Sequence, residues 1–161
     1  MKEVIPSVYQ QKNGNGTEMN YTTGKYFLDT NFLIYLFSGD EQRKQQICRE
    51  ILQAGAKEAV FVLSTQVLKE FVSVMIGKFK VQPSLVKELV DDLCQFEVIQ
   101  ITPLLIQKAV DIHTLHSFSF WDSLILVAAQ SAEANILLSE DLQHSQKLAN
   151  LTIWNPFQIE G

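Results

Sequence analysis

The pattern that most constrains the fold is an alternation, from residue 26 onward, of short apolar runs rich in β-forming residues with longer stretches of helical period. Alternation of this kind favours parallel βαβ units with right-handed crossovers. The sequence therefore predicts an α/β fold, namely a three-layer α/β/α sandwich with a mainly parallel sheet of roughly five strands. The expected strands are 26–28, 60–63, 96–101, 136–138 and 151–154.

The intervening helices have recognisable start signals. Ser64 or Thr65 can cap a helix that runs to about residue 76, and Pro83 and Pro103 suit the first turns of the next two helices. Ser119 begins an S-x-x-D sequence, which is typical of a helix start, and a mostly apolar stretch follows it. We therefore expect helices between the strands along the whole chain after residue 26.

The length of 161 residues fits one domain. Residues 1–24 are rich in Lys, Gln, Asn, Gly and Thr and show no helical or strand period, so they predict a flexible N-terminal tail before a single domain at 25–161. No apolar run approaches the roughly 20 residues that span a bilayer, and the N-terminus does not resemble a signal peptide. We expect a cytoplasmic protein that does not bind membranes.

The charge balance is acidic, with a formal net charge of −5 and a pI near 5.1. This disfavours a protein that holds nucleic acid by a broad basic surface. Bound divalent cations would offset part of the negative charge, so local phosphate binding stays possible. Arg43 and Arg49 are the only arginines, so phosphate contacts would fall mainly on lysines or backbone groups.

Four carboxylates stand where surface charges are not expected. Asp29 directly follows the first predicted strand, and Asp141 lies just past the strand at 136–138. Glu70 and Asp122 lie on predicted helices and have apolar neighbours at helical spacing, so their side chains should point inward. Ligands of open α/β sheets bind outside the carboxyl ends of the strands. We therefore expect these acids to converge on one rim of the sheet.

Such a cluster has a definite chemical consequence. Two carboxylates about 4 Å apart repel by roughly 4 kcal/mol at an effective dielectric constant of 20, so the cluster requires raised pKa values or a bound cation. Hard oxygen ligands without nearby cysteines suit Mg²⁺ or Mn²⁺, which usually keep several waters and leave room for a substrate phosphate. The pattern indicates a site for phosphoryl chemistry.

Each acid also has a simpler interpretation when it is taken singly. Asp29 could cap the helix that follows it, Asp122 could belong to a capping box, and Asp141 could cap a short helix. Glu70 could pair with a lysine of a neighbouring element. The joint occurrence of the four acids favours the metal site. Trp121 and the nearby phenylalanines could stack bases, but packing at a helix start is the favoured interpretation.

Four motifs together resemble the PIN-domain family, and the Asn155-Pro156-Phe157 ending and compact size resemble its VapC-like toxins. The first motif is Phe27-Leu28-Asp29-Thr30-Asn31, and the others fall at 63–71, 120–125 and 137–142. The similarity runs from about residue 25 to 158, in the order typical of the family. Each motif is short, so the set carries the resemblance.

The resemblance implies a Mg²⁺- or Mn²⁺-dependent endoribonuclease, the toxin of a type II toxin-antitoxin system. A metal-activated water would attack an RNA phosphodiester and leave a 5′-phosphate and a 3′-hydroxyl. The implied partners are RNA, a cognate antitoxin and a second copy of the chain. Asp29 and Asp122 are the implied direct metal ligands, and Glu70 and Asp141 complete the catalytic site. The implied supporting residues are Thr30, Asn31, Ser64 and Ser139.

Two other functions remain open at this point. A phosphatase of the haloacid dehalogenase type also places an Asp after its first strand, but such enzymes usually have a second Asp two residues later, where this chain has Asn31. A PIN-like module could instead keep the fold and bind RNA or protein without catalysis.

Overall fold

The computed structural model describes residues 10–12 and 18–158. Most of the expected flexible tail, residues 1–9 and 13–17, lies outside the described residues. The remainder of that segment includes a short antiparallel pair, β1 (Gln10–Lys12) and β2 (Glu18–Asn20). Tyr21, the residue after β2, is fully buried and belongs to the core around the main sheet.

The main sheet has six strands in the order β5-β4-β3-β6-β8-β7. The pairs among the first five of these are parallel, which confirms the predicted mainly parallel α/β architecture. The sixth strand, β7, pairs antiparallel with β8 at the edge and was not expected, because two residues are too few to show a strand period. The strands are β3 (Thr23–Leu28), β4 (Glu58–Ser64), β5 (Glu97–Ile99), β6 (Ile136–Leu138), β7 (Lys147–Leu148) and β8 (Leu151–Trp154).

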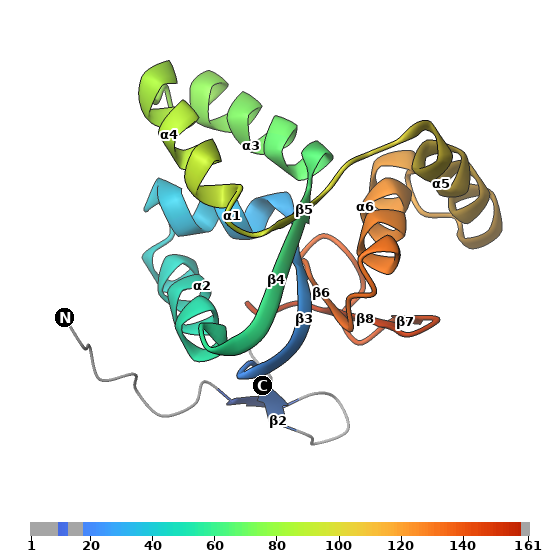
Figure 1. Ribbon diagram of the computed structural model, residues 1–161. Helices are drawn as coiled ribbons and strands as arrows, with labels where there is room; N and C mark the ends of the chain where they lie inside the picture. The colour runs from blue at the N-terminus through green and yellow to red at the C-terminus, as the bar shows by residue number, and fades with distance from the viewer. Residues whose placement is uncertain (1–9, 13–17, 159–161) are drawn as a thin grey trace.

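Helices cover both faces of this sheet, as Figure 1 shows. On one side lie α1 to α4, where α1 packs against both α2 and α3; on the other side α5 packs against α6. This is the expected three-layer arrangement. The helices are α1 (Thr30–Ser38), α2 (Gln42–Gly55), α3 (Thr65–Gly77), α4 (Pro83–Leu93), α5 (Pro103–His116) and α6 (Phe120–Ser131).

Strand β3 begins three residues earlier than the sequence predicts. Its first residues, Thr23-Gly24-Lys25, have no apolar period, but they pair with the start of β4. Gly24 has a φ of 106°, which favours glycine, and the Tyr26 hydroxyl donates to the Thr23 carbonyl at 2.6 Å. Tyr21 packs against Tyr26 with ring centroids 5.8 Å apart. Aromatic packing therefore extends the strand beyond its apolar run.

The predicted helix starts are confirmed by their caps. The Ser64 hydroxyl accepts from the Val67 amide at 3.3 Å, which settles the choice between Ser64 and Thr65. The Ser119 hydroxyl accepts from the Asp122 amide at 3.1 Å. Both hydroxyls satisfy amides that have no partner inside the helix, so each fixes where its helix begins.

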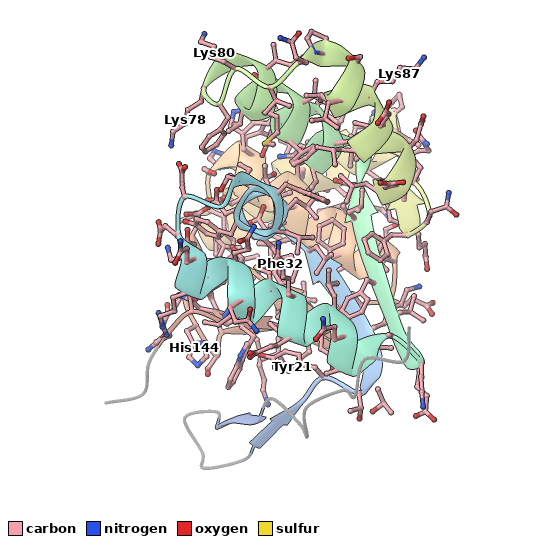
Figure 2. The ribbon with its side chains drawn as sticks, turned by 90° about the vertical axis from the view of Figure 1, so that its left-hand side faces the viewer. Tyr21, Phe32, Lys78, Lys80, Lys87 and His144 are labelled. Carbon is pink, nitrogen blue, oxygen red and sulfur yellow. The ribbon has the colours of Figure 1, made fainter. Side chains whose placement is uncertain are left out.

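The core consists of one large cluster around the sheet and a small one under α5. Phe32 of α1, labelled in Figure 2, is 1% exposed and belongs to the large cluster. The small cluster is formed by Leu105, Ala109, Leu124 and Val127. Helices α5 and α6 therefore have an apolar contact of their own. Among the described residues, no helix has both the length and the apolar character needed to cross a membrane.

Candidate metal centre

The strand order places the site. From β3 the chain moves outward through β4 to β5 and then crosses to β6 on the other side of β3, so the strand order reverses there and a crevice is expected beyond the carboxyl ends of β3 and β6. Leu28 of β3 pairs with Leu138 of β6, so the next residues, Asp29 and Ser139, are neighbours. The Ser139 hydroxyl donates to Asp29 Oδ2 at 2.7 Å. Parallel pairing thus joins residues that are 110 positions apart in the sequence.

Asp29 is the most enclosed of the four acids, with 8% of its surface exposed. Its Oδ1 accepts from the Thr30 amide at 2.7 Å, so it caps α1 while its other oxygen faces Ser139. Asp29 therefore caps α1 and also belongs to the acidic cluster, so the two interpretations of this residue are compatible. Burial raises the pKa of Asp29 to about 6; repulsion from Asp141 and Glu70 adds to this effect, and the two hydrogen bonds oppose it.

Glu70 lies half-buried on the second turn of α3. The Thr30 hydroxyl donates to its Oε2 at 2.7 Å, and the Gln66 amide donates to its Oε1 at 2.9 Å. In the described part of the chain it forms no ion pair with a lysine, contrary to its simpler interpretation. Sequence reasoning missed Gln66, although its position one turn before Glu70 on the same helix face was an available signal.

Asp141 lies in the segment after β6 and is exposed. The Asn31 amide donates to its Oδ2 at 2.9 Å, and its own backbone amide donates to the Ser139 hydroxyl at 3.3 Å. Partial burial raises the pKa of Asp141, and repulsion from Glu140, Asp122 and Glu70 contributes. Ser139 therefore links Asp141 to Asp29.

Asp122 lies in the first turn of α6, where the helix dipole favours a negative charge. All four acids line one hollow of about 330 Å³, called here the acid pocket. Other residues of its wall are Thr30, Asn31, Gln66, Ser73 and Trp121. The structure thus brings together the four acids that the sequence singled out, with Thr30, Asn31 and Ser139 bonded to them. Ser64 instead caps the helix that carries Glu70.

A second network holds the segment that carries Asp141. The ammonium of Lys44 on α2 lies 2.9 Å from Glu140 Oε2 and donates to the Tyr35 hydroxyl at 3.0 Å. The Tyr35 hydroxyl also donates to Glu140. Lys44 lies 4.3 Å from the centroid of the Tyr35 ring. This network connects α1 and α2 to the residue before Asp141, and no local pattern in the sequence predicts it.

Trp121 corrects an expectation from the sequence. Packing at the helix start was favoured for this side chain, but Trp121 is 62% exposed. Every residue from 123 to 129 is buried, so α6 is enclosed around its whole circumference there, and Trp121 is exposed because it lies in the first turn, before the enclosed part begins.

The donor set suits a hydrated divalent ion. In the described residues, no lysine or arginine forms an ion pair with any of the four acids, whose partners are hydroxyl and amide groups. No three His, Cys, Asp or Glu residues in that same part of the chain are close enough to hold a metal ion by themselves. Mg²⁺ uses few protein carboxylates and keeps several waters, so carboxylates around a hollow fit it.

The fold and this acidic rim define an α/β protein with an oxygen-donor site at the carboxyl ends of its parallel strands. The family model described as "PIN domain" matches residues 26–148. The chain belongs to the PIN domain family, as its motifs predicted. This membership also removes the haloacid dehalogenase interpretation, and Asn31 serves as a hydrogen-bond donor to Asp141.

Three solved structures share the fold. A toxin-antitoxin complex from Klebsiella pneumoniae is 22% identical, with a TM-score of 0.60, over 83% of this chain and 99% of that one. VapC20 of Mycobacterium tuberculosis, described as a sarcin-ricin loop cleaving toxin, is 20% identical, with a TM-score of 0.58, over 72% and 91%. VapBC2 of Rickettsia felis, bound to a promoter DNA fragment, is 21% identical, with a TM-score of 0.56, over 81% and 99%. Comparison with curated protein sequences gives no match.

Proposed function

We propose that this chain is a Mg²⁺- or Mn²⁺-dependent endoribonuclease and the toxin of a type II toxin-antitoxin system, acting in the cytoplasm. One observation carries the proposal. Four carboxylates without a cationic partner, in the described part of the chain, line a single pocket at the carboxyl ends of the strands. Membership of the PIN domain family and the shared fold with toxins of such systems support it.

Asp29 and Asp122 would hold the cation, and Glu70 and Asp141 would complete its surroundings directly or through water. When bound, a divalent ion supplies a water of lowered pKa and stabilises the charge that develops on the phosphodiester. The buried Asp29 must be ionised to take part, and Ser139 and the Thr30 amide stabilise that form by donating to it. Asn31 orients Asp141 in the same way.

The polar neighbours have distinct roles in this proposal. The Thr30 hydroxyl and the Gln66 amide each take one oxygen of Glu70, so its carboxylate is fixed in the pocket wall. Supporting groups of this kind set the orientation of metal ligands. Ser64 acts one step further away by fixing the start of α3.

RNA would approach an acidic protein through local lysines. Lys78, Lys80 and Lys87 are exposed around the end of α3 and the start of α4, and Figure 2 shows them at one end of the molecule. Such charges attract the phosphate backbone without reading sequence.

We also propose two protein partners, an antitoxin and a second copy of the chain. The toxin-antitoxin complexes that share this fold support the first. Leu104 and Leu115 lie on the same side of α5 by helical spacing and are 58% and 74% exposed, and we propose that they contribute to the contact between the two copies. Gel filtration with light scattering would measure the oligomeric state.

The test of the proposed function is RNA cleavage by the purified chain. We expect structured RNA to be cut in Mg²⁺ or Mn²⁺, and the activity to disappear with a chelator and in Asp29→Asn. Asp111→Asn is the matched control, because Asp111 is an exposed acid on α5 away from the acid pocket. Cleavage that persists in chelator or in Asp29→Asn would refute the proposal.

The melting temperature with and without Mn²⁺ is a second measurement, which distinguishes a nuclease from a non-catalytic PIN module. A protein with a working metal site should show a rise in melting temperature with Mn²⁺, because a ligand that binds only the folded state stabilises it. A rise in melting temperature without cleavage of any RNA would favour a binding module. If Mn²⁺ does not raise the melting temperature and no RNA is cleaved, the proposed metal site is refuted.

A further inference from the structure

A second hollow adjoins the acid pocket, and the proposed chemistry leaves it unused. This hollow, called here the apolar pocket, has a volume of about 590 Å³ and is lined mainly by Ile101, Ile106, Phe120 and Leu124. Its volume is in the range of small-molecule sites. It shares Gln66, Glu70, Ser73 and Trp121 with the wall of the acid pocket. The two pockets therefore border each other across these four residues.

The most unusual side chain of the shared wall is Trp121. It is 62% exposed, although it directly precedes Asp122 of the acid pocket. Its ring meets that of Phe120 edge to face, with centroids 5.3 Å apart. Exposed aromatic rings beside a phosphate-binding site are platforms on which unpaired bases stack. An exposed indole is also costly to leave in water, which gives it a reason to be covered.

Two polar groups add chemical detail to the apolar pocket. Lys69 is an exposed residue of its lining and forms no ion pair in the described part of the chain. Gln66 is 5% exposed, and its amide nitrogen donates to Glu70 and, at 3.3 Å, to the Trp121 carbonyl. Its Oε1 has no hydrogen-bond partner among the described residues. The Oε1 atom is itself enclosed, so Gln66 contributes to the shared wall by holding Glu70 and the Trp121 carbonyl in place.

We propose that the apolar pocket binds one unpaired nucleobase of the RNA, in the nucleotide next to the scissile phosphate. Trp121 stacks on the base, and Lys69 contacts a backbone phosphate. The inference rests on the proposed function, because the RNA must pass through the acid pocket. An apolar peptide would also suit the lining, but the wall shared with the acid pocket and the unpaired ammonium of Lys69 in the described part of the chain favour RNA.

The experiment uses the full chain in Mn²⁺ and a pool of short RNAs of random sequence, whose cut products are sequenced. For the wild-type chain we expect a preference at one position beside the cut, with purines favoured over uracil because their larger rings stack more strongly on an aromatic side chain. Stacking of about 1–3 kcal/mol per base corresponds to roughly 5- to 150-fold in affinity. Trp121→Ala should therefore raise KM by a factor in that range, change kcat much less, and lose the preference.

Two further variants separate stacking from a structural role. Trp121→Phe keeps an aromatic ring and should retain most of the base preference. Leu115→Ala is the matched control, because Leu115 on α5 is 74% exposed but does not line the apolar pocket. This control variant should behave as wild type. An RNA that lacks the base at the preferred position should raise KM for the wild-type chain but add nothing for Trp121→Ala. A merely structural residue would leave that base-removal penalty unchanged.

The outcomes distinguish this inference from the proposed function. If the wild-type chain cuts no RNA of the pool, both fail together. If it cuts RNA and Trp121→Ala keeps the wild-type KM and base preference, only the nucleobase site is overturned. Cleavage unaffected by Trp121→Ala, together with weaker binding of an antitoxin peptide, would instead assign the apolar pocket to a protein partner and also overturn it.

Discussion

Ser139→Ala removes a single oxygen that links the Asp29 carboxylate to the backbone amide of Asp141. The Ser139 hydroxyl donates to Asp29 Oδ2 at 2.7 Å and accepts from the Asp141 amide at 3.3 Å. A hydrogen bond to a charged group is worth about 1.5–3 kcal/mol, which is roughly a 10- to 150-fold change in a protonation equilibrium. The bond lowers the pKa of Asp29 against the effect of burial, so its loss should favour the protonated acid.

The consequence for metal binding follows from the pKa of about 6 of Asp29. At pH 7 about one tenth of the wild-type Asp29 is protonated, and a tenfold shift of the equilibrium would protonate about half of it. The affinity for Mn²⁺ at pH 7 should therefore fall about 2-fold for the weakest bond and about 15-fold for the strongest. The loss should shrink as the pH rises toward 9, where Asp29 ionises again.

Calorimetric titration of Mn²⁺ into the metal-free protein at pH 7 and at pH 9 measures this effect. Ser123→Ala is the matched control, since Ser123 is also fully buried and its hydroxyl donates to the Ser119 carbonyl within the helix. Wild-type affinity of Ser139→Ala at pH 7 would refute the reasoning. An equal loss at both pH values would show that the serine acts through shape and not through ionisation.

Three further predictions concern stability. The pKa of Asp29 is raised in the folded state, so the ionisation of Asp29 lowers the free energy of unfolding as the pH rises through about 4 to 6. Asp29→Asn should therefore stabilise the metal-free protein by about 1–3 kcal/mol at pH 7.5, measured by urea unfolding. At pH 3.5, where Asp29 is protonated, the same substitution should give no stabilisation. Lys44→Met breaks a half-buried ion pair and should cost about 1–3 kcal/mol, whereas Lys25→Met breaks a more exposed one and should cost at most about 1 kcal/mol. Equal losses in the two variants would contradict the importance of burial. Gly55→Ala places a methyl 2.5 Å from a phenylalanine ring of β4 and should cost about 1–3 kcal/mol, while Gly77→Ala, with open space, should be neutral or stabilising by up to about 1 kcal/mol in thermal melts.

The strand pattern and the acids were readable from the sequence because both are local signals. Buried parallel strands appear as short apolar runs, and a carboxylate at a strand end or on an apolar helix face is visible without a structure. Ser64 and Ser119 were likewise found from cap chemistry alone. Strand β7 was missed because its partner, and not its own two residues, defines it.

The features that sequence reasoning missed depend on contacts between distant segments. The Lys44 ion pair with Glu140 joins α2 to the segment after β6, across 96 positions. The role of Gln66 depends on the contact between α3 and α6, because its amide donates both to Glu70 of α3 and to the Trp121 carbonyl of α6. The exposure of Trp121 depends on where along α6 burial begins, and neighbouring elements decide this, not the apolar pattern of the helix itself.

The pairing of β3 with β6 has a consequence for the order in which the molecule acquires its proposed activity. Ribosomes make proteins from the N-terminus, and pairings between distant strands form only once both strands exist. The buried carboxylate after β3 is synthesised early, yet the serine that stabilises its charge and the last acid of the pocket come 110 residues or more later. A nascent chain that stops before residue 136 would hold the first acid without its partner. The topology thus delays an intact site until synthesis is nearly finished, so a truncated or stalled chain would lack it.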